Sequence, residues 1–365
     1  MNLFLFEIKK IIRTKSLFLI LSLTCLLISI LFIHNLMKQD LIQSEKLEHF
    51  SGISRELSTN ILADREYLNE ADDPAVSNRI DIGINLQQEL SILIDSIRKN
   101  DWKQELESEV LVYHLAETYK NVQGDFKITT IEMEKIIKLN EELLISDLPK
   151  ESERASIQPA VFMKQMISLF INTFGFLIFF VIFLPFLSKE FEDNHMKWLY
   201  TTPAPRYQLF LHKYVSIILS GVIWLLTLFG LSYGLPTLFG KNVDNAFQYP
   251  LFTTSEDFIY ISDYILQAGI YSFGLMLFGT SVLLLITLFI RHTVLSTIIV
   301  VSTFFWHYIL LKNNTYSLLN PFTYVEVDSI ILENPHYFPW GAVVLFLGTM
   351  LLVSTSLLIN HKRGI

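Results

Sequence analysis

The run SLFLILSLTCLLISILFIHNLM, residues 16–37, contains no Asp, Glu, Lys or Arg. About 20 consecutive apolar residues are enough for a helix to cross the hydrocarbon core of a bilayer. Four basic residues precede the run, as they do in a signal peptide: Lys9, Lys10, Arg13 and Lys15. The apolar run is long for a signal peptide, and no small-residue cleavage site follows it. We therefore interpret residues 16–37 as a retained membrane anchor.

The composition of the whole chain is also typical of a membrane protein. Of its 365 residues, 51% are hydrophobic and 18% are charged, whereas about 25% of the residues in soluble domains are charged. Cys25 is the one cysteine, so the chain cannot form an intrachain disulfide. Any part outside the cell must therefore be held together by packing.

Five further runs are long enough to span a bilayer as helices. They are residues 161–187, 214–235, 264–290, 293–311 and 339–360. The sequence therefore predicts an all-α membrane protein with six transmembrane helices. The connecting segments are residues 38–160, 188–213, 236–263 and 312–338, and the two ends are residues 1–15 and 361–365.

The basic residues that flank the spans predict their orientation, because cytoplasmic loops are enriched in Lys and Arg. Residues 1–15, residues 188–213, Arg291 and the tail at Lys362-Arg363 lean basic, and the other connecting segments lean acidic. All six spans agree on one topology in the cell (plasma) membrane, with both termini in the cytoplasm. Residues 38–160 then form a large extracytoplasmic insertion between the first two spans.

The first 15 residues alternate apolar and basic side chains in the manner of an amphipathic helix. Such a helix lies in the plane of the membrane interface. The alternative is that these turns simply extend the first span into the cytoplasm.

Residues 38–160 have helical periodicity, with Leu86, Leu90, Leu93 and Ile97 on one face. Breaks at residues 72–74, 100–101 and 124–125 divide the segment into about four helices, and we expect a helical bundle or hairpin stalk. Its carboxylates show no metal-ligand spacing. Its acidic surface is open to two interpretations, capture of cationic peptides or simple solvation.

The predicted spans lack the groups that several membrane functions require. They contain no Asp or Glu, whereas ion-coupled transporters carry ionisable groups at depth. There is no P-loop and therefore no nucleotide site of that kind, and we expect no metal or nucleic-acid ligand. His307 is the one side chain within a span that is a candidate for a translocation path. A neutral histidine bonded to a neighbouring helix is the alternative.

The segment between the second and third spans is highly charged: KEFEDNHMKWLYTTPAPRYQLFLHKY, residues 189–214. Acidic residues at its start complement a helix dipole, and Pro203 and Pro205 end that helix. Apolar and aromatic side chains follow the acids: Met196, Trp198, Leu199 and Tyr200. Aromatic anchors rimmed by charge are typical of a protein docking site. An interfacial helix that places its aromatic rings among the lipid headgroups is equally compatible.

This segment resembles the coupling helix of ABC-2 type transporter permeases, which contacts the ATP-binding subunit. The matching positions are Glu190, Glu192, Lys197, Trp198-Leu199-Tyr200, Thr202-Pro203, Arg206 and Lys213. Asn194 and His195 depart from the family pattern, which often has Gly-Thr there. The order of the spans and the insertion after the first span also resemble this family.

The resemblance implies that the chain is the membrane subunit of an ABC exporter. It would pair with itself or a sister permease and with two cytoplasmic ATPase subunits, which bind ATP and Mg²⁺. The cargo would be amphipathic, with a peptide, a lipid-like molecule and a drug as open alternatives, and bacterial antimicrobial peptide export or resistance as one setting. The resemblance assigns ATPase coupling to Glu190, Glu192, Met196, Lys197, Trp198, Leu199, Tyr200, Pro203, Arg206 and Lys213. The competing hypothesis is a membrane sensor or scaffold with a ligand-binding extracytoplasmic domain.

Overall fold

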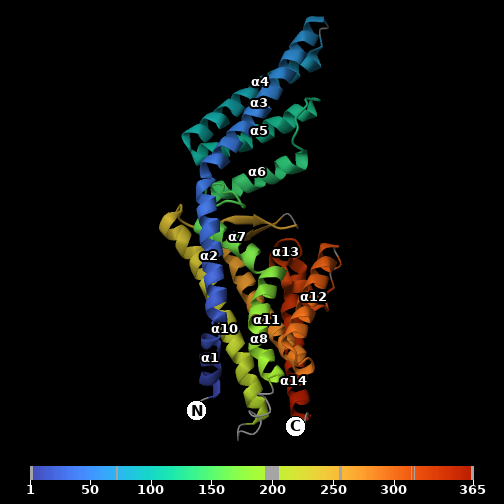
Figure 1. Cartoon of the computed structure of the whole chain (residues 1–365). Helices are drawn as coiled ribbons and strands as arrows, with labels where there is room; N and C mark the ends of the chain where they lie inside the picture. Colours follow the sequence, from blue (N-terminus) through green and yellow to red (C-terminus); the bar gives the residue numbers. More distant parts are fainter. Residues whose placement is uncertain are drawn as a thin grey trace. The chain divides into compact units, whose positions relative to one another are not determined.

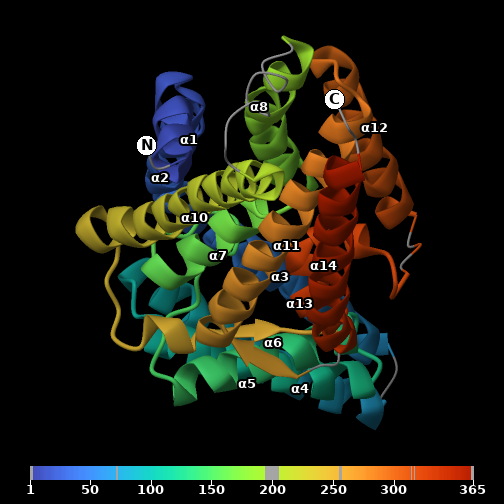
Figure 2. The same cartoon turned by 90° about the horizontal axis from the view of Figure 1, so that it is seen from below.

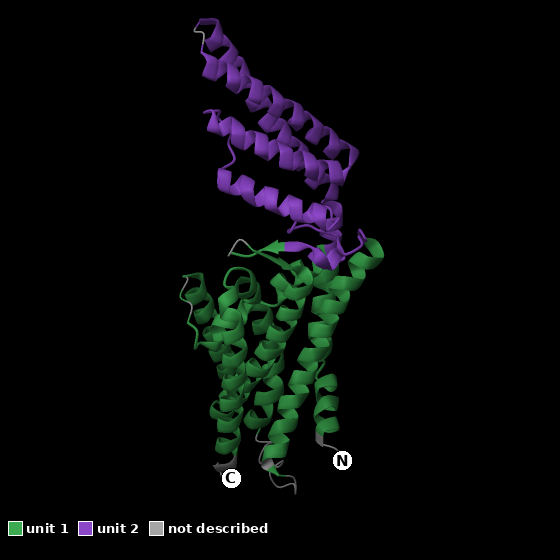
Figure 3. Cartoon of the chain, turned by 180° about the vertical axis from the view of Figure 1, so that it is seen from behind, with its two compact units in different colours: residues 1–31, 162–239, 251–365 green, residues 32–161, 240–250 purple. Residues whose placement is uncertain are grey.

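The computed structural model describes residues 3–70, 73–193, 205–254, 257–313, 315 and 317–362 (Figure 1). The chain divides into two compact units, which Figure 3 colours separately. Unit 1 comprises Met1–Leu31, Phe162–Phe239 and Leu251–Ile365, and unit 2 comprises Phe32–Val161 and Gly240–Pro250.

Long helices make up most of unit 1, as the apolar runs predict. In chain order the helices that lie wholly or partly in it are α1 (Leu3–Arg13), α2 (Ser16–Met37), α7 (Pro159–Phe170), α8 (Thr173–Glu192), α10 (Arg206–Phe239), α11 (Ile261–Phe289), α12 (Thr293–Lys312), α13 (Val327–Leu332) and α14 (Phe338–Lys362). Among the described residues, six stretches are long and apolar enough to cross a membrane: Ser16–Met37, Thr173–Glu192, Tyr207–Phe239, Ile261–Phe289, Thr293–Lys312 and Pro335–Asn360. The prediction of an all-α membrane protein with six spans is therefore confirmed.

The core of unit 1 forms around α11, which contacts α8, α10 and α14 (Figure 2). Buried phenyl rings of α8 fill the space beside it, and the ring of Phe179 lies 5.3 Å from that of Trp224 in α10. The Trp224 indole N–H donates to the Thr24 hydroxyl of α2 at 2.8 Å. Because a buried indole N–H needs an acceptor, this bond fixes α2 against α10.

The helices of unit 1 differ from the predicted spans at several ends. Residues 161–187 form two helices rather than one, because the Asn172 side chain accepts from the N–H groups of Phe174 and Gly175 and so begins α8. The chain also turns at Lys15, which has φ 58°, so α1 is a helix separate from α2. The 236–263 connection contains a two-stranded sheet of β1 (Pro250–Phe252) and β2 (Phe258–Tyr260).

In its described part, unit 2 wholly contains four α-helices, each in contact with the next: α3 (Gln39–Glu70), α4 (Pro74–Lys99), α5 (Trp102–Asn121) and α6 (Thr130–Ile145). The helix ends lie at the predicted breaks. Asp73 caps α4 with Pro74 as its first residue, and Asn100 ends α4 in the left-handed conformation. Thr129 and Glu132 cap α6 reciprocally.

The apolar stripes of these helices form the core of unit 2. Leu86, Leu90, Leu93 and Ile97 are all at most 1% exposed, which confirms the predicted periodicity. In α6 the buried stripe runs through Met133 and its i+4 and i+7 neighbours, so Ile131 lies off the stripe and is 65% exposed.

Candidate functional site

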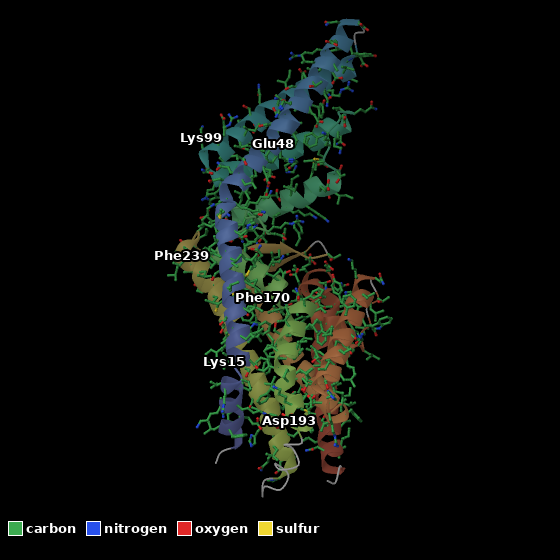
Figure 4. All side chains as sticks on the ribbon, in the orientation of Figure 1. Lys15, Glu48, Lys99, Phe170, Asp193 and Phe239 are labelled. Carbon is green, nitrogen blue, oxygen red and sulfur yellow. The ribbon has the colours of Figure 1, made fainter. Side chains whose placement is uncertain are left out.

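The predicted coupling segment, residues 188–213, joins α8 to α10. Helix α8 ends at Glu192, with Asp193 as its C-cap (Figure 4). Helix α10 begins at Arg206. Six of the predicted coupling residues lie outside the described residues: Met196, Lys197, Trp198, Leu199, Tyr200 and Pro203. The side chain of Arg206 is likewise outside the described part. The structure does locate the side chains of Glu190, Glu192 and Lys213.

Glu190 and Lys213 are brought together at the two ends of the coupling segment, in a buried charge cluster with Glu7 and Lys10 of α1. Lys213 Nζ lies 2.9 Å from Glu7 Oε1 and also pairs with Glu190 Oε2. Lys10 pairs with the other oxygen of Glu190. Two carboxylates and two ammonium groups therefore balance each other in charge.

The cluster is closed to solvent on most sides. Lys213 is 0%, Glu7 2% and Glu190 6% exposed, whereas the Lys10 side chain retains 25% exposure. The Phe186 ring forms one wall, 4.8 Å from Lys10 Nζ and 5.4 Å from Lys213 Nζ. Burial, and then the positive charge of Lys213, lowers the pKa of Lys10, and the Glu190 carboxylate opposes that shift.

Glu192 faces a different helix. Its Oε2 accepts from the Thr293 backbone N–H at 3.1 Å, and its Oε1 lies 3.1 Å from His292 Nδ1. One turn before Glu192 on α8, the Ser188 hydroxyl donates to the Thr293 hydroxyl. The last turn of α8 thus contacts α1 and α10 through Glu190, and the first turn of α12 through Glu192.

His307, the predicted candidate for a translocation path, is half-buried in α12. Its Nδ1 lies 2.8 Å from the carbonyl of Thr303, and its ring stacks on Phe322 with centroids 4.3 Å apart. These contacts anchor the ring within its own helix and against the 3₁₀ turn Pro321–Val325.

Glu7 was not predicted as a site residue, and Lys10 was predicted only as one of the basic residues that precede the first span. One signal was present: Glu7 stands among apolar residues on one face of a short amphipathic helix, with Phe4 and Ile11 at three- and four-residue spacing. A carboxylate on a buried face requires a cationic partner. The sequence alone does not show that this partner is Lys213.

The buried charges join helices to one another. The described residues contain no group of three or more His, Cys, Asp or Glu side chains that could hold a metal ion. A paired buried charge fixes geometry, because removing either partner leaves the other uncompensated. The cluster therefore connects α1, α8 and α10 at the two flanks of the coupling segment.

The sequence matches one family model, described as an ABC-2 family transporter protein, over residues 1–339. No curated protein and no solved structure gives a match.

Proposed function

The chain belongs to the ABC-2 transporter family, whose members are the permease components of ABC transporters, and from that membership we propose that it exports an amphipathic cargo. ATP and Mg²⁺ bind to separate cytoplasmic ATPase subunits, since the sequence contains no P-loop. The permease pairs with a second permease subunit, and spans from both subunits enclose the cargo path. Unit 2 lies outside the cell and the coupling segment lies inside.

The observation that carries this mechanism is the buried charge cluster. When the ATPase subunits close on ATP, they push on the segment around Trp198. Because Glu190 and Lys213 flank that segment and both pair with α1, the push moves α1, α8 and α10 together. Glu192 carries the same displacement to α12 through Thr293.

Six of the predicted coupling residues fall into two groups. Glu190 and Lys213 are buried, so they position the segment and do not touch the ATPase. Lys197, Trp198, Tyr200 and Arg206 provide the contact surface. His307 is the one side chain proposed for the cargo path.

Co-purification with the ATPase encoded beside this chain tests the contact surface. We expect Trp198→Ala and Arg206→Glu each to lower the amount of recovered ATPase at least about tenfold, because central aromatic and arginine side chains dominate interface energies. Trp306→Ala is the matched control, since Trp306 is 61% exposed on α12 and lies far from the coupling segment in the sequence. Recovery of the ATPase at the wild-type level with Trp198→Ala and Arg206→Glu contradicts the proposal.

A further inference from the structure

Unit 2 contains a cavity of about 910 Å³ that is unrelated to the charge cluster of unit 1. Five segments wall it: the start of α3, the end of α4, the start of α5, residues 147–155 and residues 241–245. All five belong to unit 2. Ligand-binding cavities in proteins have volumes of about 300–1,000 Å³, so the space is large enough for several side chains of a ligand.

Hydrogen bonds between these segments hold the walls in place. The Gln43 amide donates to the carbonyl of Ile97 at 3.0 Å, and the Gln39 amide donates to that of Ala155 at 2.8 Å. The backbone N–H of Lys241 donates at 3.3 Å to the carbonyl of Ile157, just beyond the wall segment 147–155. The cavity is therefore preformed, which lowers the entropic cost of binding.

The cavity walls carry an excess of negative charge. Four of the wall charges take part in three ion pairs: Lys46 with Glu105 at 2.7 Å, Asp147 with Lys103 at 2.5 Å, and Lys150 with Glu109 at 2.9 Å. Asp40 and Asp244 form no ion pair with any described residue. Among the described side-chain donors, the Glu151 carboxylate accepts a hydrogen bond only from the Ser156 hydroxyl. Lys241 is the one wall lysine outside these pairs.

Apolar groups lie between the charges. Ile42, Pro149, Val243 and the ring of Trp102 contribute to the walls. The Trp102 ring already attracts a cation, since Lys103 Nζ lies 5.3 Å from its centroid. A ligand with ammonium or guanidinium groups and an aromatic side chain would complement both features.

We infer that this cavity binds a cationic, aromatic-bearing peptide, with Asp40, Asp244 and Glu151 facing its positive groups and Trp102 its apolar side chain. The three carboxylates come from three different chain segments, which suits a ligand with several separated charges. The inference does not depend on export, because binding requires neither an ATPase nor a second subunit.

The test uses the full chain in phosphatidylcholine nanodiscs and a fluorescein-labelled Lys-Trp-Lys-Gly-Lys-Trp peptide, followed by anisotropy against empty nanodiscs. We expect saturable binding that the Asp40→Asn/Asp244→Asn double variant weakens about tenfold at low salt, since each charge contact contributes a few-fold in affinity. Asp81→Asn/Glu134→Gln is the matched control, because it removes the same charge from exposed positions outside the cavity and leaves binding unchanged. Trp102→Ala weakens binding, and Trp102→Phe restores it.

Three results would overturn the inference. The first is no binding to the wild-type chain. The second is an equal loss of peptide affinity in the cavity and control double variants, which would show that the peptide is attracted at long range by an acidic surface. The third is equal displacement of the probe by spermine or by the Glu-Trp-Glu-Gly-Glu-Trp peptide, which would show that the cavity does not recognise a cationic peptide.

Discussion

Lys213 is the residue on which the charge balance of the buried cluster depends, since it contacts both Glu7 and Glu190. Replacing it with Met leaves two buried carboxylates beside Lys10 alone. Removing one partner of a buried ion pair typically costs about 3–5 kcal/mol, so we expect Lys213→Met to lower the stability of the full chain strongly. Lys189→Met, at an exposed position on α8, is the control and has little effect. Thermal unfolding in nanodiscs measures both.

A variant in which all four charges of the cluster are removed shows how much of the stability depends on charge balance and how much on side-chain shape. We expect Glu7→Gln, Lys10→Met, Glu190→Gln and Lys213→Met together to recover most of the stability that Lys213→Met alone loses, because no uncompensated charge remains. If the combined variant is less stable than Lys213→Met, the cluster contributes more than charge neutrality, and the loss in Lys213→Met is not due to an uncompensated charge.

Glu151 makes unit 2 sensitive to pH. Burial raises its pKa above the usual range, although the bond from Ser156 opposes the shift. The folded chain therefore holds this proton more tightly than the unfolded chain, so stability falls as pH rises from the unfolded pKa, about 4.3, through the folded pKa. We expect Glu151→Gln to raise the melting temperature at pH 7.5 and to have no effect at pH 4. Glu141→Gln, on the exposed side of α6, should change neither value.

Among the elements, α8 and α11 depend on a close approach at Gly279. A Cβ there would lie 2.0 Å from the Phe180 ring, which is itself enclosed by Phe179 and Phe304. Overpacking of this kind costs about 1–3 kcal/mol, so Gly279→Ala should lower the melting temperature. Gly230→Ala should leave it unchanged or raise it, because nothing lies within 4 Å of that position and alanine is the better helix former. Shifts of the same sign in both variants would contradict the observed packing.

The first turn of α12 depends on α8 for its cap. His292, the N-cap residue, makes no side-chain cap bond, and Glu192 accepts the Thr293 N–H instead. Losing an N-cap acceptor costs about 1 kcal/mol, which corresponds to an approximately fivefold larger population of the open turn. Hydrogen exchange of the amides at residues 293–296 should accelerate by that factor in Glu192→Ala. Asp193→Ala, at the exposed end of α8, is the control, and equal acceleration there would remove the assigned role of Glu192.

The helices of this protein could be predicted because they are encoded locally. Runs of apolar residues give the six spans, and Asp73-Pro74 and Asn100-Asp101 mark helix ends of unit 2 through their own backbone chemistry. The break before α8 was missed, because Asn172 stands within a continuous apolar run and its capping role shows only when its side chain turns back on the next N–H groups.

The site was harder to predict than the helices, because it depends on distant parts of the chain. Similarity to a family motif identified Glu190 and Lys213, but as contacts to a partner. Their burial depends on which turn of α8 and of α10 faces α1, and periodicity within one helix does not determine that. The cavity of unit 2 likewise combines five segments, and residues 241–245 are separated from the other four along the chain by α7, α8 and α10.

At the scale of the whole molecule, six spans and one insertion fix which segments share a side of the membrane. The insertion follows the first span and the coupling segment follows the second, so an odd number of crossings separates them. Basic residues favour the cytoplasm for the coupling segment, and we therefore predict that unit 2 lies outside the cell. Since Cys25 is the one cysteine, Cys25→Ser gives a background in which each added thiol reports its own location.

In that background we expect a membrane-impermeant maleimide to label Asn85→Cys, at an exposed position on α4, in intact cells. Trp198→Cys should be labelled only after permeabilisation, because a segment that binds an ATPase must face the cytoplasm. The Asn85→Cys result controls for access of the reagent to the cell surface, and permeabilised cells control for thiol reactivity. Labelling of Trp198→Cys in intact cells would place the segment on the side that contains no ATP, and neither the coupling role of α8 and α10 nor the relay through Lys213 would then survive.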